Sequence, residues 1–312
     1  MQYVKNEWIK MWSQKNAWIM LIITIGLLAL VTGVNKYYDD PSSTQEERLK
    51  ANEEQLANYK EGAAYEGNTV EDIAFYNEKI ATIEYRIAND LPSETSMSLF
   101  EHLNFNLSLS IMIISIFTTV IAAGIVSNEF GTGTIKMLLT RPVARWKILL
   151  SKLVASILYG LTLLVITCAF SAVVGFILFN NDNAITLSVV NGQVVEQAME
   201  STYFETIGYA LASMVMTMIF AFMVGSLFGS STLAVSLSLF ILLMGQTATM
   251  FLAKYEFAKY IWFANDLSYY APGSYPMIED LTLGFSVAVN IVYAVIFLAI
   301  TFIYFMKRDV TA

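Results

Sequence analysis

Six long apolar blocks interrupt this sequence of 312 residues, and they constrain its fold more than any other feature. The blocks cover residues 17–34, 106–126, 148–179, 206–228, 232–253 and 283–306. Most are close to or above the roughly 20 apolar residues that cross a bilayer core as a helix. Only 14% of the residues are charged, well below the quarter or so that is typical of soluble domains. We therefore predict an all-α membrane protein with six transmembrane helices.

The first and third blocks depart from the usual span length. The first is short, so we expect its helix to begin a turn earlier, at Trp12. No small-residue cleavage site follows Val34, which argues against a cleavable signal peptide and for a retained first span. The third block is long enough to tilt or to project past the bilayer.

Basic residues concentrate in three segments, 1–16, 127–152 and 307–312, which hold ten of the eighteen Lys and Arg residues but three of the twenty-six Asp and Glu residues. Short segments rich in Lys and Arg stay in the cytoplasm. We therefore predict that the N terminus (1–16), the 127–147 loop and the C-terminal tail (307–312) are cytoplasmic. The acidic segments 35–105, 180–205 and 254–282 are then extracellular.

Two of the predicted outer loops carry elements of their own. In 35–105, Ser43 with Glu46 and Thr69 with Asp72 resemble helix-capping boxes. Apolar residues recur after each box, and Pro92 follows as a stop, so we predict an antiparallel helical hairpin with acidic polar faces. This hairpin either braces the outer mouth of the protein or contacts a cationic substrate or partner. In 180–205, the pair Asn191–Gly192 between apolar runs predicts a small β-hairpin.

The third outer loop, 254–282, is rich in Tyr, Trp and Phe, which favour the headgroup layer. We expect this loop to lie at the membrane surface or to re-enter the membrane. Anchoring in the aromatic belt is the simpler role, and a lipid-facing gate is the alternative.

Residue types that carry chemistry are scarce. Cys168 and His102 are the one cysteine and the one histidine, so an internal disulfide and a zinc set are excluded. The phosphate-binding pattern G-x-x-x-x-G-K-[ST] does not occur in the sequence. The predicted spans lack the midplane carboxylates of ion-coupled transporters, and Lys152 is close enough to the cytoplasmic end to snorkel. These features argue against an enzyme, a metal site and nucleotide hydrolysis by this chain.

Two helices present faces suited to packing. Val4, Trp8, Met11 and Trp12 share one face of a predicted helix over 1–16, with lysines elsewhere around it. This pattern is typical of a helix lying in the membrane interface, although the segment also qualifies as a simple basic flank of the first span. In the fourth span, Ala221, Gly225 and Gly229 recur at four-residue spacing, which lets another helix approach closely. The pattern leaves open whether that partner is the fifth span or a second copy.

The loop between the second and third spans has a helical rhythm. Ile135, Leu138 and Leu139 are spaced i, i+3 and i+4, so they share one face. The residues from Gly131 to Thr134 supply the helix start and Pro142 ends it. We predict a two-turn amphipathic helix beneath the membrane, which at its simplest would only connect the two spans.

The residues Asn128-Glu129, Gly131-Thr132, Leu138-Leu139-Thr140, Pro142-Val143 and Arg145 resemble those of ABC-2 type permeases. These proteins are the membrane subunits of a class of ABC transporters. The motif lies within 128–152, and the plan of six spans with both ends inside extends the resemblance to the whole chain. Ala144 replaces the Ser or Thr of many relatives, which affects a capping contact. The hairpin in 35–105 is not common to all members of that family.

The resemblance implies a function and a set of partners. In that family this loop is a coupling helix that docks in a cleft of a separate ATPase subunit. The coupling residues would be Glu129, Gly131, Thr132, Ile135, Leu138, Leu139, Pro142 and Arg145, with Glu129 and Arg145 able to pair across the base of the helix. The segment 1–16 would be the connecting helix against the same ATPase. Two ATP-binding cassette ATPase subunits would bind ATP and Mg.

The same resemblance implies a second permease subunit, either identical or related, and contact with membrane lipid but not with nucleic acid. The expected activity is export of an amphiphile, with a peptide or antibiotic favoured over lipid or polymer precursors, in a bacterial plasma membrane. An alternative is a membrane sensor or immunity protein that binds cationic peptides through the acidic hairpin without transport. An intramembrane enzyme is a weak third reading, because the predicted spans lack a nucleophile, dyad or metal set.

Overall fold

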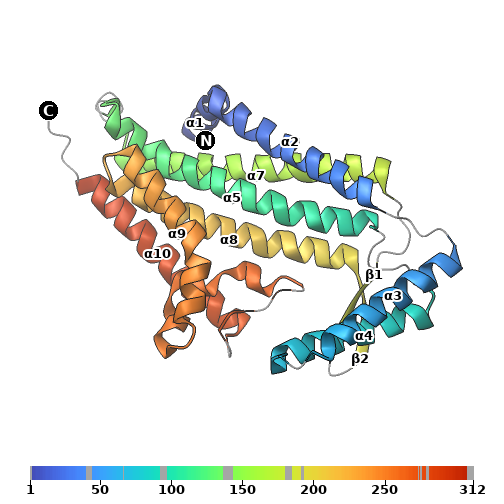
Figure 1. Ribbon diagram of the computed structural model, residues 1–312. Helices are drawn as coiled ribbons and strands as arrows, with labels where there is room; N and C mark the ends of the chain where they lie inside the picture. The colour runs from blue at the N-terminus through green and yellow to red at the C-terminus, as the bar shows by residue number, and fades with distance from the viewer. Residues whose placement is uncertain are drawn as a thin grey trace. The chain divides into compact units, whose positions relative to one another are not determined.

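The computed structural model describes residues 2–39, 44–65, 67–91, 97–135, 143–179, 185–190, 193–272, 274, 276–278 and 281–307. The chain forms two compact units. The first comprises Met1–Leu27, Leu107–Ala169 and Glu205–Ala312, and the second comprises Leu28–Asn106 and Phe170–Phe204. Figure 1 gives the labels used below.

Six helices are long and apolar enough to cross a membrane, as predicted. They are α2 (Lys15–Tyr38), α5 (Leu99–Gly131), α7 (Arg145–Leu178), α8 (Met199–Leu227), α9 (Ser231–Leu252) and α10 (Leu283–Lys307). Helices α5 and α8 each start seven residues before the predicted blocks, because helical backbone continues into polar flanking residues that hydropathy does not detect. Ser98 and Glu101 cap the early start of α5, since each backbone N–H donates to the other side chain.

The predicted start of the first span at Trp12 is wrong. Trp12 ends a separate helix, α1 (Gln2–Trp12), and α2 begins at Lys15 after a short break. The break is held by the Ser13 hydroxyl, which donates to the carbonyl of Lys10 at 2.7 Å. The N-terminal helix is therefore an independent element and not an extension of the span.

The core of the first unit forms where α5, α7 and α8 run beside one another (Figure 1). Its fully buried residues include Val126 of α5, Leu149 and Tyr159 of α7, and Phe222 of α8. Two of the three residues in the predicted small-residue stripe, Ala221 and Gly225, lie in this core, whereas Gly229 is exposed and follows the end of α8 at Leu227. A Cβ added at Gly225 would collide with the carbonyl oxygen of Ala123 in α5, and Ala221 is fully buried. Within this chain, the partner of the stripe is thus the second span, α5, which neither of the alternatives considered from sequence had named.

Four segments meet at one end of the first unit. Arg145, at the start of α7, donates to the carbonyl of Met306 near the end of α10 at 3.4 Å. The ring of Phe130 in α5 lies 6.2 Å from that of Phe305, and a Cβ at Gly131 would lie 3.7 Å from the carbonyl oxygen of Gly229. The end of α5, the start of α7, the α8–α9 link and the end of α10 therefore share one end, as the charge pattern predicts. That this end faces the cytoplasm stays a prediction.

The aromatic loop folds onto the helices of the first unit. It forms three short 3-10 helices, η1 (Glu256–Tyr260), η2 (Trp262–Asn265) and η3 (Leu267–Tyr270). Trp262 packs against Phe220 of α8 and Phe297 of α10, with ring centroids 5.2 and 6.1 Å apart. Asn265 is fully buried. This loop is therefore a packed element and not only a surface anchor.

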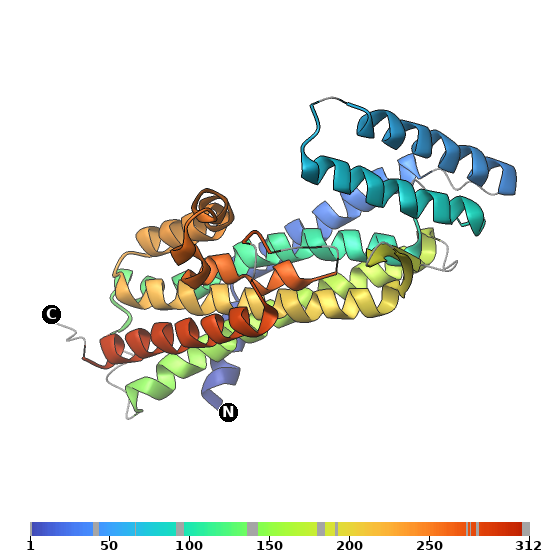
Figure 2. The same ribbon diagram turned by 90° about the horizontal axis from the view of Figure 1, so that it is seen from below.

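In the second unit, α3 (Gln45–Ala63) and α4 (Val70–Ala88) pair along their lengths (Figure 2). Their antiparallel order follows from Lys60, late in α3, which pairs with Glu84 at 3.0 Å, and from Asn52, early in α3, which donates to the carbonyl of Leu91. The helical hairpin of the acidic loop is thus present. The capping box Thr69–Asp72 is confirmed.

The first predicted cap of this hairpin is displaced by one residue. Thr44 and Glu47 form the capping box of α3, whereas Ser43 lies outside the described residues. Thr44 has the extended backbone that a cap requires, and its side chain accepts from the backbone of Glu47. Both positions carry the same residue classes as the predicted pair, so the sequence pattern alone did not distinguish the two registers.

The predicted β-hairpin is also present. Strands β1 (Ile185–Val190) and β2 (Gln193–Ala198) pair antiparallel in a register that places Val190 opposite Gln193. The predicted turn residues, Asn191 and Gly192, lie outside the described residues. The strands pack on α4, where the Tyr85 hydroxyl donates to Glu196 at 2.9 Å.

Candidate functional site

The predicted coupling loop is described on both of its sides. Helix α5 continues to Gly131, so Gly131 is the last residue of this helix and not the start of the next one. A turn follows, in which Thr132 donates to the carbonyl of Asn128 and Gly133 adopts the left-handed conformation that favours glycine, at φ 71°. Ile135 is buried. Leu138, Leu139 and Pro142 lie outside the described residues, so the predicted amphipathic helix stays a prediction.

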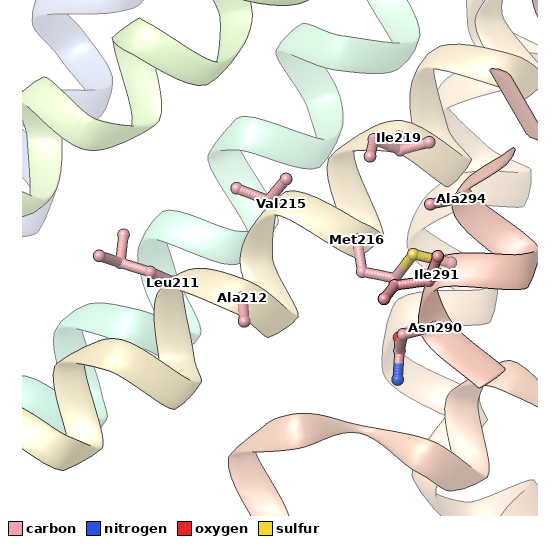
Figure 3. A pocket seen from close by; sticks show the side chains of 8 residues that line it. All are labelled: Leu211, Ala212, Val215, Met216, Ile219, Asn290, Ile291 and Ala294. Atoms are coloured by element: carbon pink, nitrogen blue, oxygen red, sulfur yellow. The ribbon is translucent and has the colours of Figure 1, made fainter. Parts of the chain in front are cut away.

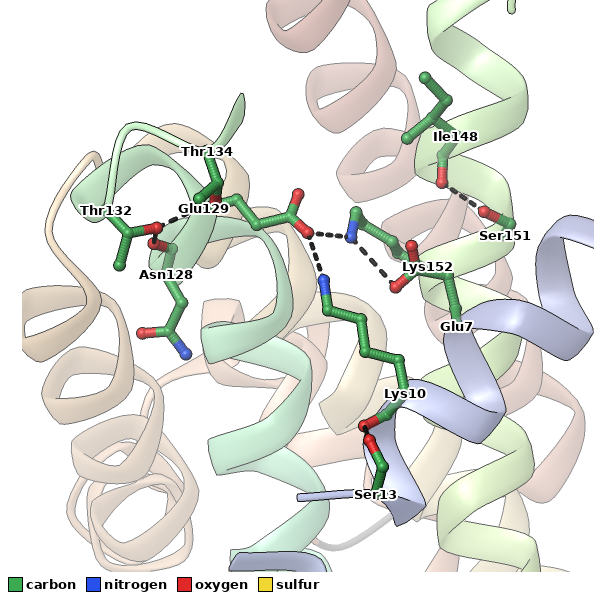
Figure 4. A network of polar contacts seen from close by, with 10 residues as sticks. All are labelled: Glu7, Lys10, Ser13, Asn128, Glu129, Thr132, Thr134, Ile148, Ser151 and Lys152. Carbon is green, nitrogen blue, oxygen red and sulfur yellow. Dashed lines mark hydrogen bonds and ion pairs between the residues drawn. The ribbon is translucent and has the colours of Figure 1, made fainter. Parts of the chain in front are cut away.

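A buried network of charges lies at the base of this loop (Figure 4). One oxygen of Glu129, near the end of α5, accepts from Lys152 of α7 at 2.6 Å and from Lys10 of α1 at 3.0 Å. Lys152 also pairs with Glu7 of α1 at 3.2 Å. Four residues of three helices are thus joined through direct ion pairs, which we call the base network.

The members of the base network differ in burial. The side chains of Lys152 and Glu129 are 1% and 8% exposed, whereas that of Lys10 is 53% exposed. A buried charge that loses its partner is strongly destabilising, by about 3–5 kcal/mol, while an exposed pair contributes about 0–1 kcal/mol. Breaking the Glu129–Lys152 pair would therefore cost the most stability in the base network, and the ion pair of Lys10 is the one most easily broken.

The pKa of Lys10 reflects the contact of α1 with Glu129. Burial by itself lowers the pKa of Lys10, but the hydrogen bond and attraction from Glu129, with a further contribution from Glu7, outweigh it and the pKa is raised. The second carboxylate oxygen of Glu129 is buried and has no hydrogen-bond partner among the described residues. The carboxylate thus places both of its ammonium contacts on one oxygen.

Two sequence expectations about these residues are wrong. Glu129 pairs with Lys10 and Lys152 and not with Arg145 among the described contacts, and one nitrogen of the Arg145 guanidinium donates to the carbonyl of Met306. Lys152 does not snorkel to the surface. It turns inward, since two carboxylates lie within ion-pairing distance.

Helix α1 is amphipathic as predicted, and its apolar face packs against α2 and α7. Met11 is buried, and the ring of Trp12 lies 6.2 Å from that of Trp8, 5.5 Å from that of Trp18 and 5.1 Å from that of Tyr159. The Trp18 indole donates to the carbonyl of Trp12 at 2.9 Å. Helix α1 is therefore held to α2 and α7 by aromatic packing and to α5 and α7 by charge.

Sequence reasoning missed the base network as a site. It noted Glu129 and Lys152 separately, and the signal that could have joined them was available: a carboxylate and an ammonium near the ends of adjacent apolar blocks tend to pair. No such signal indicated the contribution of Lys10 and Glu7, because the local sequence of α1 does not show which helices α1 packs against. Among the described residues, no group of three or more His, Cys, Asp or Glu is placed to hold a metal ion.

Comparison with known proteins gives a family without an assigned activity. Residues 68–311 match the family described as "Protein of unknown function (DUF2705)". The chain is 35% identical to "Uncharacterized protein YhcI" of Bacillus subtilis (strain 168), over 98% of each chain. It is 30% identical to "Uncharacterized membrane protein YdbK" of the same organism, over 69% of this chain and 85% of that protein. No solved structure matches. With its six apolar helices, the chain is a multi-pass membrane protein.

Proposed function

We propose that this chain, which belongs to the DUF2705 family of proteins of unknown function, is the membrane-spanning subunit of an ATP-driven exporter. A separate ATPase subunit would bind ATP and Mg and would dock on the segment between α5 and α7. The base network is the observation that carries the proposal. It joins the two helices that flank this segment to α1.

The base network suits the transmission of force. A load on the segment between α5 and α7 first reaches the end of α5 and the start of α7, which the Glu129–Lys152 pair holds together at 2.6 Å. Because Glu7 and Lys10 extend the pairing to α1, the three helix ends would move as one body. A linker that only connected two spans would need no buried ion pair, whose desolvation is costly.

The sequence supports a division of labour between subunits. It lacks a Gly-rich phosphate loop, so the energy source would be another chain. The segment's apolar residues Leu138 and Leu139 would fill a groove on that chain, and its two basic residues, Lys136 and Arg141, would set the orientation. By the same resemblance, two permease subunits would form the pathway, and the cargo would be an amphiphile such as a peptide or antibiotic leaving a bacterial plasma membrane.

The test combines Leu138→Glu with Leu139→Glu. We expect this variant to insert in the membrane, to lose its ATPase partner on purification and to lose ATP-dependent movement of amphiphiles in proteoliposomes. The matched control is Leu49→Glu with Ile73→Glu, two exposed apolar residues of the α3–α4 hairpin, which should retain both properties. Normal transport by the first variant would contradict the proposal.

The sensor alternative predicts a different outcome in the same vesicles. A cationic peptide would bind the acidic α3–α4 hairpin, and the addition of ATP and the ATPase would move nothing across the membrane. Saturable binding without ATP-dependent movement would therefore favour a sensor or immunity protein.

A further inference from the structure

A groove lies between α8 and α10 in the first unit (Figure 3). Its volume is about 430 Å³, within the range of roughly 300–1,000 Å³ that is usual for small-molecule sites. It is lined by Leu211, Ala212, Val215, Met216 and Ile219 of α8 and by Asn290, Ile291 and Ala294 of α10. Seven of these eight residues are apolar, and the two alanines leave room that larger side chains would fill.

The groove lies at the depth of the hydrocarbon core. Asn290 is the eighth residue of α10, which places it about 10 Å below the start of the helix at 1.5 Å per residue. Both helices belong to the membrane-crossing set. An apolar groove at this depth does not hold water, so an alkyl chain from the surrounding bilayer is the matching occupant.

Asn290 gives the groove its one polar side chain. Its amide nitrogen donates to the carbonyl of Asn265 at 2.6 Å and to that of Ser286 at 2.8 Å. Two carbonyl acceptors use both N–H groups and fix the orientation of the amide. The side-chain oxygen of Asn290 then has no hydrogen-bond donor among the described contacts.

Such an acceptor is unfavourable in hydrocarbon, where no water can satisfy it. A ligand that brings a hydrogen-bond donor removes this cost, and a ligand that lacks one does not. The groove lining contains no charged residue, so nothing there would stabilise an ionised group. The donor that fits is neutral, such as a hydroxyl or an amide N–H.

We propose that the α8–α10 groove binds a neutral amphiphile dissolved in the bilayer, with one alkyl chain along α8 and a hydroxyl or amide donor at the side-chain oxygen of Asn290. The 3-10 segment positions this oxygen, because Asn265 holds the amide nitrogen and the Ser286 hydroxyl in turn donates to Asn265 at 2.8 Å. The aromatic loop and the groove are thus connected by hydrogen bonds through Asn290.

The test measures binding of two matched probes to the full chain in nanodiscs. One is tritiated 1-dodecanol, which has a donor, and the other is tritiated dodecyl methyl ether, which has an acceptor only. We expect the alcohol to bind saturably and about two- to tenfold more tightly than the ether, as one added hydrogen bond predicts. Equal affinity for the two probes would overturn the assignment of a donor at Asn290.

Two variants locate the site. Ala294→Phe fills the groove and should abolish saturable binding of dodecanol. Ala288→Phe adds the same side chain to an exposed position of the same helix outside the groove, and should leave binding unchanged. Saturable binding that survives Ala294→Phe, or that Ala288→Phe removes equally, would overturn the proposal.

The two proposals fail separately. Binding is measured without ATP or an ATPase, so loss of the groove leaves the permease proposal standing. Conversely, a chain that recruits no ATPase would still bind dodecanol.

Discussion

Lys152 carries its charge one turn or more inside a membrane-crossing helix, and its position depends on two carboxylates from other elements. Replacement by Met keeps the apolar stem and removes the ammonium, which leaves Glu129 buried beside the half-exposed Lys10. We expect Lys152→Met to lower the free energy of unfolding by about 3 kcal/mol or more. Lys147→Met, at an exposed position of the same helix, should change it by less than about 0.5 kcal/mol. Unfolding titrations in mixed micelles measure both.

Removal of both buried charges provides the check on this reading. The double variant Lys152→Met with Glu129→Leu removes both charges of the most buried pair and leaves Glu7 and Lys10 of α1, whose side chains are 16% and 53% exposed. It should therefore be more stable than Lys152→Met alone, because replacing a buried pair is cheaper than breaking it. If the two losses simply add, the residues do not act as a pair.

At the scale of elements, two glycines of α8 differ in how closely another helix approaches them, because one of them contacts α5 and the other does not. A methyl group at Gly225 would collide with the Ala123 carbonyl, whereas nothing lies within 4 Å of a methyl group at Gly208. We expect Gly225→Ala to lower the free energy of unfolding by about 1–3 kcal/mol through overpacking. Gly208→Ala should raise it by about 0.5–1 kcal/mol through helix propensity. Equal effects of the two substitutions in thermal unfolding would show that α8 does not pack tightly on α5.

The start of α4 depends on pH. Hydrogen bonds from the backbone and the hydroxyl of Thr69 hold the pKa of Asp72 below its usual value of 3.8. A lowered carboxyl pKa contributes stability above the unfolded value and loses it as the pH falls through the folded value. The protection of the amides of residues 70–73, measured relative to their intrinsic exchange rates, should therefore decrease below about pH 4 in the native chain. Asp72→Asn should show lower protection already at pH 5 and little further change with pH, and a native-like pH profile of protection in that variant would contradict the cap.

The elements that the sequence predicted well are those with local causes. Apolar length defined the six spans, Thr69 with Asp72 marked a helix start, and two apolar runs around Asn191–Gly192 marked a β-hairpin. The partners of Glu129 were not predictable in this way, since Lys10 lies 119 residues away along the chain. The folding of the aromatic loop onto α10 through Asn265 and Asn290 also depends on tertiary packing, and composition indicated only a preference for the membrane interface.

At the scale of the whole molecule, the separation of basic and acidic segments predicts on which side of the membrane each loop and terminus lies. Cys168 is the one native cysteine, so a Cys168→Ser background allows single reporters. Ala144→Cys, at the exposed last position of the proposed docking segment, and Glu54→Cys, on an exposed face of α3, mark the two predicted sides. In intact cells a membrane-impermeant maleimide should label Glu54→Cys and not Ala144→Cys, and permeabilisation should expose the latter. Because an ATPase partner is cytoplasmic, labelling of Ala144→Cys in intact cells would place the docking segment outside and remove the basis for coupling, whatever the stability of the base network.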